Sequence, residues 1–208
     1  MFQETLNLLE SSAEYKSDFI KNDWIRYFTS SILAGALLGF GVFLAITVGA
    51  LTYQYGPQYK IYMGLSFGIA LNLVVMTNSE LFTGNNMVMI TGLLARKINI
   101  KSYTSIFVLS YIGNFIGAII IAALYAYSGL EDGSSTKLIT SITHAKTSMP
   151  ILTLFLGGML CNILICLAIL FSIKMKNEAA KIIMISWCLF AFITTGYEHC
   201  IVNMILFS

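Results

Sequence analysis

Two short polar segments interrupt long apolar stretches of this chain, and each contains an ionisable side chain. The first is Asn78-Ser79-Glu80-Leu81-Phe82-Thr83-Gly84-Asn85, and the second is Gly196-Tyr197-Glu198-His199-Cys200-Ile201-Val202-Asn203. An ionisable residue within a membrane-spanning stretch is costly and is a functional-site hypothesis by default. Histidine can donate a hydrogen bond or a proton near neutral pH, because its reference pKa is about 6.5. The two segments therefore indicate a pathway for a small polar solute.

The composition is that of an integral membrane protein. Of the 208 residues, 57% are hydrophobic and 11% are charged, and the mean hydropathy is +0.80. About 20 apolar residues span the core of a bilayer, and five runs with at most one charged residue reach that length. They are 27–59, 61–95, 102–130, 147–173 and 182–208. We expect an all-α protein in a lipid bilayer, and the net charge of +2 is too small to indicate nucleic acid.

The basic residues predict the orientation in the membrane. Nine of the twelve lysines and arginines lie before the first span, between the second and third, or between the fourth and fifth. Cytoplasmic loops carry the excess of basic residues. We therefore predict a multi-pass protein of the cell membrane with a cytoplasmic N-terminus. The three basic residues on the other side are Lys60, Lys137 and Lys146.

The chain divides into a short N-terminal segment and a channel domain. Residues 1–26 predict an amphipathic helix at the cytoplasmic interface, and residues 27–208 form the transmembrane domain. Residues 128–149 between the third and fourth spans are predicted as a polar loop. All four cysteines, Cys161, Cys166, Cys188 and Cys200, fall within predicted spans. Since they lack zinc-type spacing, we expect them to pack as small apolar residues, with no metal and no cofactor.

The second and fifth spans are predicted to be broken helices. Residues 61–95 are too long for one straight crossing, and irregular backbone at membrane depth survives only inside protein or beside a cavity. Glu80 precedes Asn85 by five residues, as Glu198 precedes Asn203. This correspondence indicates an inverted repeat, with a first half of about 27–130 and a second of about 147–208. The repeat lacks a sixth span, so we expect the sequence to be a piece of a longer chain.

Three motifs, in this order, resemble the formate/nitrite transporter family. They are Glu80-Leu81-Phe82-Thr83-Gly84-Asn85, Gly157-x3-Cys161-Asn162 and Gly196-Tyr197-Glu198-His199-x3-Asn203-Met204. The resemblance extends from the first span to the end of the chain. It implies an aquaporin-like fold and a homopentamer in which each protomer has its own pore for small monovalent anions.

The resemblance also implies roles for individual residues. The pore or substrate residues are His199, Thr83, Lys146 and Asn162. The inner constriction is Leu71, Leu81 and Phe192, and the outer one is Phe67 and Phe82. Glu198 and Asn203 resemble residues that support the histidine and the second break. From the sequence itself, we expect Glu80 and Asn85 to support the first break, where Asn114 of the third span would bind freed backbone groups.

These residues predict transport of formate, nitrite, hydrosulfide or a similar anion, coupled to protonation. A bare anion loses its hydration in an apolar constriction at a large free-energy cost, which a protonated acid avoids. Lys146 would attract anions to the mouth, and Thr83 and His199 would donate hydrogen bonds.

Simpler interpretations of the same residues stay open. His199 and Glu198 could be a buried hydrogen-bonded pair, Phe82 and Phe192 core aromatics, and Lys146 a snorkelling anchor. A neutral-solute channel of aquaporin type is the alternative function, although paired Asn-Pro-Ala motifs are absent from the sequence. We expect no enzyme, because no nucleophile–base pair is evident.

Overall fold

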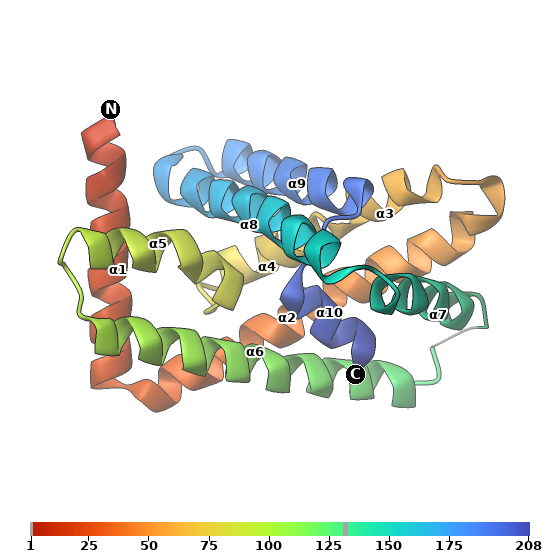
Figure 1. The fold of residues 1–208 in the computed structure, drawn as a ribbon, viewed down its shortest axis with the longest axis horizontal. Coiled ribbons are helices and arrows are strands. Elements are labelled where there is room, and N and C mark those ends of the chain that lie inside the picture. The colour runs from red at the N-terminus through yellow and green to blue at the C-terminus, as the bar shows by residue number, and fades with distance from the viewer. Residues whose placement is uncertain (1, 131–132) are drawn as a thin grey trace.

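The computed structural model describes residues 2–130 and 133–208, and within these residues the regular structure is helical throughout (Figure 1). The first half comprises α1 (Phe2–Asn22), α2 (Trp24–Thr52), the 3-10 turn η1 (Tyr53–Tyr55), α3 (Tyr59–Phe67), α4 (Ile69–Met76), α5 (Phe82–Leu94) and α6 (Ile100–Tyr127). The second half comprises α7 (Gly133–Thr147), α8 (Ile151–Lys174), α9 (Glu178–Thr195) and α10 (Cys200–Phe207). Glu131 and Asp132 of the predicted loop, and Met1 of the predicted N-terminal segment, lie outside the described residues.

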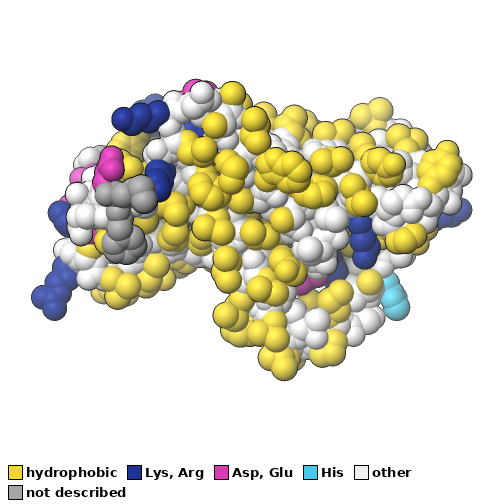
Figure 2. Space-filling view, turned by 90° about the horizontal axis from the view of Figure 1, so that it is seen from above, with side chains coloured by type: hydrophobic (Ala, Val, Ile, Leu, Met, Phe, Trp, Pro, Cys, Tyr) yellow, Lys and Arg dark blue, Asp and Glu magenta, His cyan; other side chains and the backbone are white. Residues whose placement is uncertain are grey.

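Five stretches of the described helices are long and apolar enough to cross a membrane. They are Trp24–Tyr55, Tyr59–Met76, Ile100–Tyr127, Ile151–Lys174 and Glu178–Thr195. They run roughly along one common axis, and α1 crosses one end of the bundle (Figure 1). Figure 2 shows a broad hydrophobic surface, with most of the visible charged side chains gathered at the α1 end. Such an apolar exterior suits a hydrocarbon environment.

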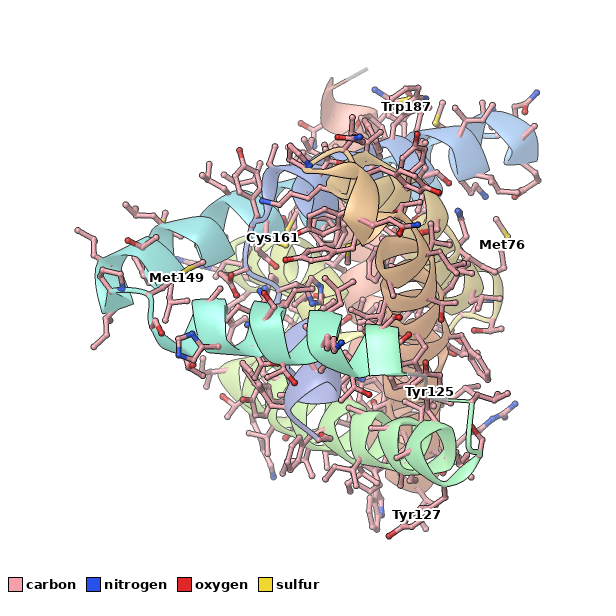
Figure 3. All side chains as sticks on the ribbon, turned by 90° about the vertical axis from the view of Figure 1, so that its right-hand side faces the viewer. Met76, Tyr125, Tyr127, Met149, Cys161 and Trp187 are labelled. Carbon is pink, nitrogen blue, oxygen red and sulfur yellow. The ribbon has the colours of Figure 1, made fainter. Side chains whose placement is uncertain are left out.

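Side-chain direction separates the outside of the bundle from its interior. Looking along the bundle, Figure 3 shows Tyr127 and Trp187 pointing outward on different sides, whereas Cys161 points inward. Their exposed fractions are 92% for Tyr127, 58% for Trp187 and 1% for Cys161. Large aromatic side chains on the outer surface are favourable in contact with lipid or at its interface.

Glycines bring α2 and α6 into close contact. A Cβ atom on Gly35 would lie 2.2 Å from the backbone oxygen of Asn114, and one on Gly117 would lie 2.0 Å from that of Ile32. Small residues four apart allow this kind of backbone approach between membrane helices. The prediction of close packing at these glycines is confirmed, and the contact brings Asn114 of α6 next to α2.

Two non-helical connections meet near the middle of the molecule. The first lies between the end of α4 at Met76 and the start of α5 at Phe82, and the second between the end of α9 at Thr195 and the start of α10 at Cys200. Gly196 ends α9 with a left-handed φ of 80°, a conformation that glycine adopts without strain. In Figure 1, α5 and α10 both begin in the central region. The two polar segments of the sequence therefore lie at helix ends.

The prediction of a loop over 128–149 is wrong for most of its length. Gly133–Thr147 forms helix α7, in which Leu138 is buried and Ile139 and Ile142 pack against the main core cluster. These three side chains share one helix face, since residues three and four apart are neighbours on a helix. The surrounding polar residues obscured this short apolar stripe.

The N-terminal segment forms a helix that packs on the bundle. Leu9, Ala13 and Ile20 of α1 are buried and share a core cluster with Val88 of α5 and Ile106 of α6. Their spacing of three to four residues, or its multiple, places them on one face of α1. This face positions Lys16, which belongs to the site described next.

Candidate functional site

The first connection carries a buried ion pair. Both carboxylate oxygens of Glu80 lie 2.6 Å from Nζ of Lys16 in α1, and the Glu80 side chain is only 4% exposed. A carboxylate this deeply buried requires a partner of opposite charge. The sequence analysis placed Glu80 at the first break but did not identify Lys16 as its partner.

Asn114 binds backbone on both sides of the α2–α6 contact. Its Oδ1 accepts a hydrogen bond of 2.8 Å from the N–H of Phe82, at the start of α5. Its Nδ2 donates to the carbonyl oxygens of Ser31 at 2.7 Å and of Glu80 at 3.0 Å. The side chain is fully buried. Nearby, the buried Asn85 donates to the hydroxyl of Tyr27 at 3.2 Å.

His199 joins the two connections. It is the N-cap of α10, and its Nδ1 accepts from the backbone N–H of Val202 at 3.2 Å. Because an accepting nitrogen carries no proton, the neutral ring holds its proton on Nε2. Nε2 lies 3.1 Å from Oγ1 of Thr83, so the ring donates to that hydroxyl oxygen. The Thr83 O–H is then free to donate to another group.

Glu198 forms a second buried ion pair. Its Oε2 lies 2.7 Å from Nζ of Lys146 in α7 and accepts from Nδ2 of Asn203 at 2.9 Å. The side chains of Lys146 and Glu198 are 15% and 8% exposed. Lys146 is therefore not an isolated cation. Among the described contacts, the His199 ring bonds Thr83 and Val202 rather than Glu198, so the interpretation as a His199–Glu198 pair is not supported.

Apolar side chains surround the histidine. The ring of His199 stacks on Phe192 with centroids 5.7 Å apart, and Phe192 meets Phe67 edge-on at 5.6 Å. Leu71 and Leu81 are buried in the same core cluster as these two phenylalanines. Phe82 instead packs its ring edge-on against Phe107 and Tyr111 of α6. The structure thus brings together the predicted constriction residues except Phe82, whose described ring contacts are with α6.

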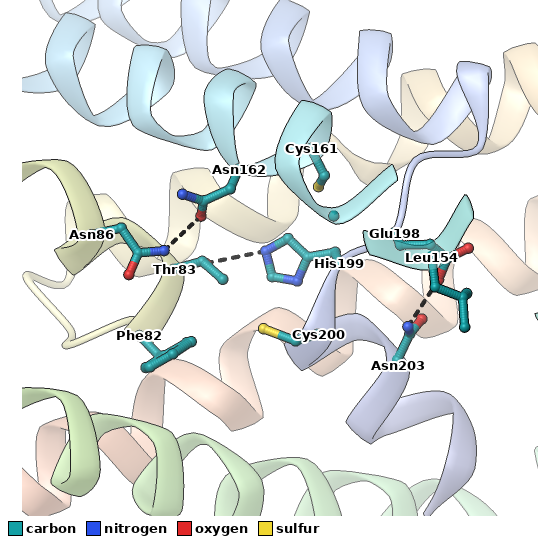
Figure 4. Close-up of a pocket in the computed structure, with 11 residues that line it drawn as sticks. Phe82, Thr83, Asn86, Leu154, Cys161, Asn162, Glu198, His199, Cys200 and Asn203 are labelled. Carbon is teal, nitrogen blue, oxygen red and sulfur yellow. Dashed lines mark hydrogen bonds between the residues drawn. The ribbon is translucent and has the colours of Figure 1, made fainter. Parts of the chain in front are cut away.

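Three cavities adjoin these residues. One of about 350 Å³, which we call the chamber, has Phe82, Thr83, Asn162, Glu198, His199 and Asn203 in its wall (Figure 4). A second of about 350 Å³ is lined by Lys146, Phe67, Phe192 and also His199. A third of about 570 Å³ is lined by Lys16, Glu80 and Leu81. The third cavity thus shares no lining residue with the other two among the residues described.

One polar residue of the chamber was missed by the sequence analysis. Asn86 of α5 lines the chamber and donates from Nδ2 to Oδ1 of Asn162 at 2.9 Å. Asn86 follows Thr83 by three residues and therefore shares its helix face, which is the signal that could have identified it. No group of three or more metal-ligating side chains occurs among residues 2–130 and 133–208.

Comparison with known proteins relates this arrangement to one family. The formate/nitrite transporter family model matches residues 3–208. The nitrite transporter NirC of Escherichia coli K12 is 40% identical over 213 residues, covering 100% of this chain and 77% of that protein. An FNT family ion channel of known structure is similar, with a TM-score of 0.91 and 38% identity over 99% of this chain and 82% of that one. A pentameric formate channel with formate bound gives a TM-score of 0.77 and 28% identity over 89% and 74% of the two chains.

These similarities extend over nearly the whole chain and agree with its five apolar helices, so the molecule is a multi-pass membrane protein. The relatives are named as transporters and channels, and not as enzymes. The chain belongs to the formate/nitrite transporter family.

Proposed function

We propose that this protein conducts small monovalent anions of weak acids, such as formate, nitrite or hydrosulfide, across the cell membrane. The observation that carries the proposal is the buried Thr83–His199 hydrogen bond of 3.1 Å, which joins the starts of α5 and α10. The nitrite transporter and the formate channel among its similar proteins support the same class of solute.

The Thr83 hydroxyl is the proposed donor to the anion. The fixed ring proton of His199 occupies one lone pair of Oγ1, which orients the Thr83 O–H away from the histidine. The N-termini of α5 and α10 add unsatisfied backbone N–H groups, which favour negative charge nearby. Asn162, with its partner Asn86, supplies further polar groups in the chamber wall.

Apolar side chains separate the third cavity from the other two in this account. A bare anion passing Leu71, Leu81, Phe67 and Phe192 would lose its hydration at a large free-energy cost. Passage as the neutral acid avoids that cost, so transport is proposed to be coupled to protonation. Phe82, with its ring against α6, is proposed to border the chamber rather than to close the path.

The two ion pairs support an inverted repeat with two broken spans. Lys16 lies in the helix before α2 and meets Glu80, and Lys146 lies in the helix before α8 and meets Glu198. We propose that 27–130 and 147–208 are the two halves of this repeat, in an aquaporin-like arrangement. Each lysine neutralises the carboxylate at its break, so that neither cavity repels an approaching anion. Lys146 then acts by cancelling charge as well as by attraction.

The orientation and the assembly are further parts of the proposal. The connections 95–99 and 175–177 lie at the same end of the bundle as α1 (Figure 1). With the N-terminal segment, this end collects nine of the twelve basic residues, which supports a cytoplasmic N-terminus. The similar pentameric formate channel and the broad apolar exterior support a homopentamer in the bilayer.

Flux measurements in liposomes test the proposed function. Liposomes containing the full chain should take up formate, nitrite or hydrosulfide faster than protein-free liposomes, and uptake should rise with inward acidification. The control is osmotic swelling in glycerol, which should match that of protein-free liposomes. Swelling in glycerol without anion uptake would favour the neutral-solute alternative and overturn the proposal.

A further inference from the structure

Three of the four cysteines gather at the chamber. Cys161 and Cys200 line it, and Sγ of Cys166 accepts from Nδ2 of Asn162 at 3.5 Å. In Figure 4, the sulfur of Cys200 lies beside the His199 ring and points to the side of Phe82 and Thr83. Cys200 is exposed, whereas Cys161 is buried. The chamber thus brings a reachable thiol next to the proposed solute-binding hydroxyl.

A second feature of the chamber indicates the chemical form of its ligand. Oε1 of Glu198 is buried in a side chain that is 8% exposed, and it has no hydrogen-bond partner within the described part of the chain. A buried acceptor of this kind is stabilised by a hydrogen-bond donor. The nitrite anion has no proton to donate, but nitrous acid does. The chamber therefore combines an acceptor for the O–H of a neutral acid, the Thr83 donor and the Cys200 thiol.

We propose that Cys200 is a site of S-nitrosation by nitrous acid that enters the chamber. This inference rests on the proposed function, because it requires nitrite to be among the solutes. The sulfur attacks the nitrosyl nitrogen, the N–OH bond breaks, and the hydroxyl group leaves as water with the thiol proton. The products are an S-nitrosothiol and water, so the step requires no oxidant or reductant.

The modification makes the pathway respond to its own solute. The added N=O group lies in a chamber of about 350 Å³ beside His199 and Thr83. It therefore narrows the path and competes for the Thr83 hydroxyl. A low-molecular-weight thiol reverses the change by accepting the nitroso group and returning a proton to Cys200. Prolonged exposure to nitrous acid thus lowers flux, and a free thiol restores it.

The test uses the full chain in liposomes, exposed to sodium nitrite at mildly acidic pH and, in parallel, at neutral pH. Mass spectrometry of the peptides locates S-nitrosothiols, and nitrite uptake is measured before and after exposure. The variants are Cys200→Ser and, as a matched control, Cys188→Ser. Cys188 is a buried thiol of α9 that is not among the residues of the chamber wall.

The expected result is acid-dependent modification of Cys200 in the unaltered chain and in Cys188→Ser. Both should lose nitrite uptake on exposure and recover it with glutathione, whereas Cys200→Ser should keep its own starting uptake. Nitrite uptake without modification of Cys200, or equal modification of Cys188 and Cys200, would overturn the inference and leave the proposed function intact. Modification of Cys200 in a chain that conducts no nitrite would instead contradict nitrite transport while retaining the reactive site.

Discussion

Replacing Asn114 with leucine should destabilise the protein far more than the same change elsewhere at membrane depth. The substitution removes the acceptor for the Phe82 N–H and the donors to Ser31 and Glu80, all in a fully buried position. An unpaired buried N–H costs about 1–3 kcal/mol and each lost carbonyl bond about 1 kcal/mol, which gives about 3–5 kcal/mol in total. The free energy of unfolding, measured by denaturant titration in mixed micelles, should fall by this amount.

Asn162→Leu is the matched control for this prediction. Asn162 is a half-buried asparagine of α8 whose described bonds are to side chains, Asn86 and Cys166. Its replacement leaves no backbone group unpaired, so it should cost about 1 kcal/mol. If the two leucine variants unfold within about 1 kcal/mol of each other, the inference that Asn114 stabilises the start of α5 is incorrect.

The remaining predictions concern the ion pair, the helix contact and the exposed histidine. Lys16→Met should lower the free energy of unfolding by about 3–5 kcal/mol, because it leaves Glu80 charged and buried, and adding Glu80→Leu should restore most of the loss. Gly35→Ala should lower the melting temperature, since its Cβ would lie 2.2 Å from a backbone oxygen, whereas Gly133→Ala, with nothing within 4 Å, should not. His144→Ala should leave anion uptake and its pH dependence unchanged, because that side chain is exposed on α7; a changed pH profile would contradict this assignment.

The sequence was sufficient to identify the two polar segments, because charged or strongly polar residues are rare within apolar runs. Glu80 and Glu198 stand out for this reason, and the α2–α6 glycines stand out by their spacing. The five apolar runs likewise identify the five long helices, whose compositions differ sharply from those of the connections. These are local properties of the chain.

Long-range pairing could not be predicted in this way. Lys16 is separated from Glu80 by 64 positions and Lys146 from Glu198 by 52. No periodicity relates such residues, and an isolated lysine near a predicted helix end is equally compatible with snorkelling. Lys146 was therefore expected to be a free cation at the mouth, whereas the structure pairs it. The same limit applies to the side chain of Phe82, because its contacts depend on how α5 packs against α6.

The most direct test of the proposed pathway is nitrite and formate uptake by Thr83→Val and Thr83→Ser in liposomes. Valine keeps the shape of threonine but removes the hydroxyl that accepts from His199, whereas serine keeps the hydroxyl. A hydrogen bond to a charged group contributes about 1.5–3 kcal/mol, so uptake by Thr83→Val should fall about 10- to 150-fold. Thr83→Ser should retain most of the uptake. Equal uptake by the valine variant and the unaltered chain would contradict the assignment of Thr83 as the donor to the anion.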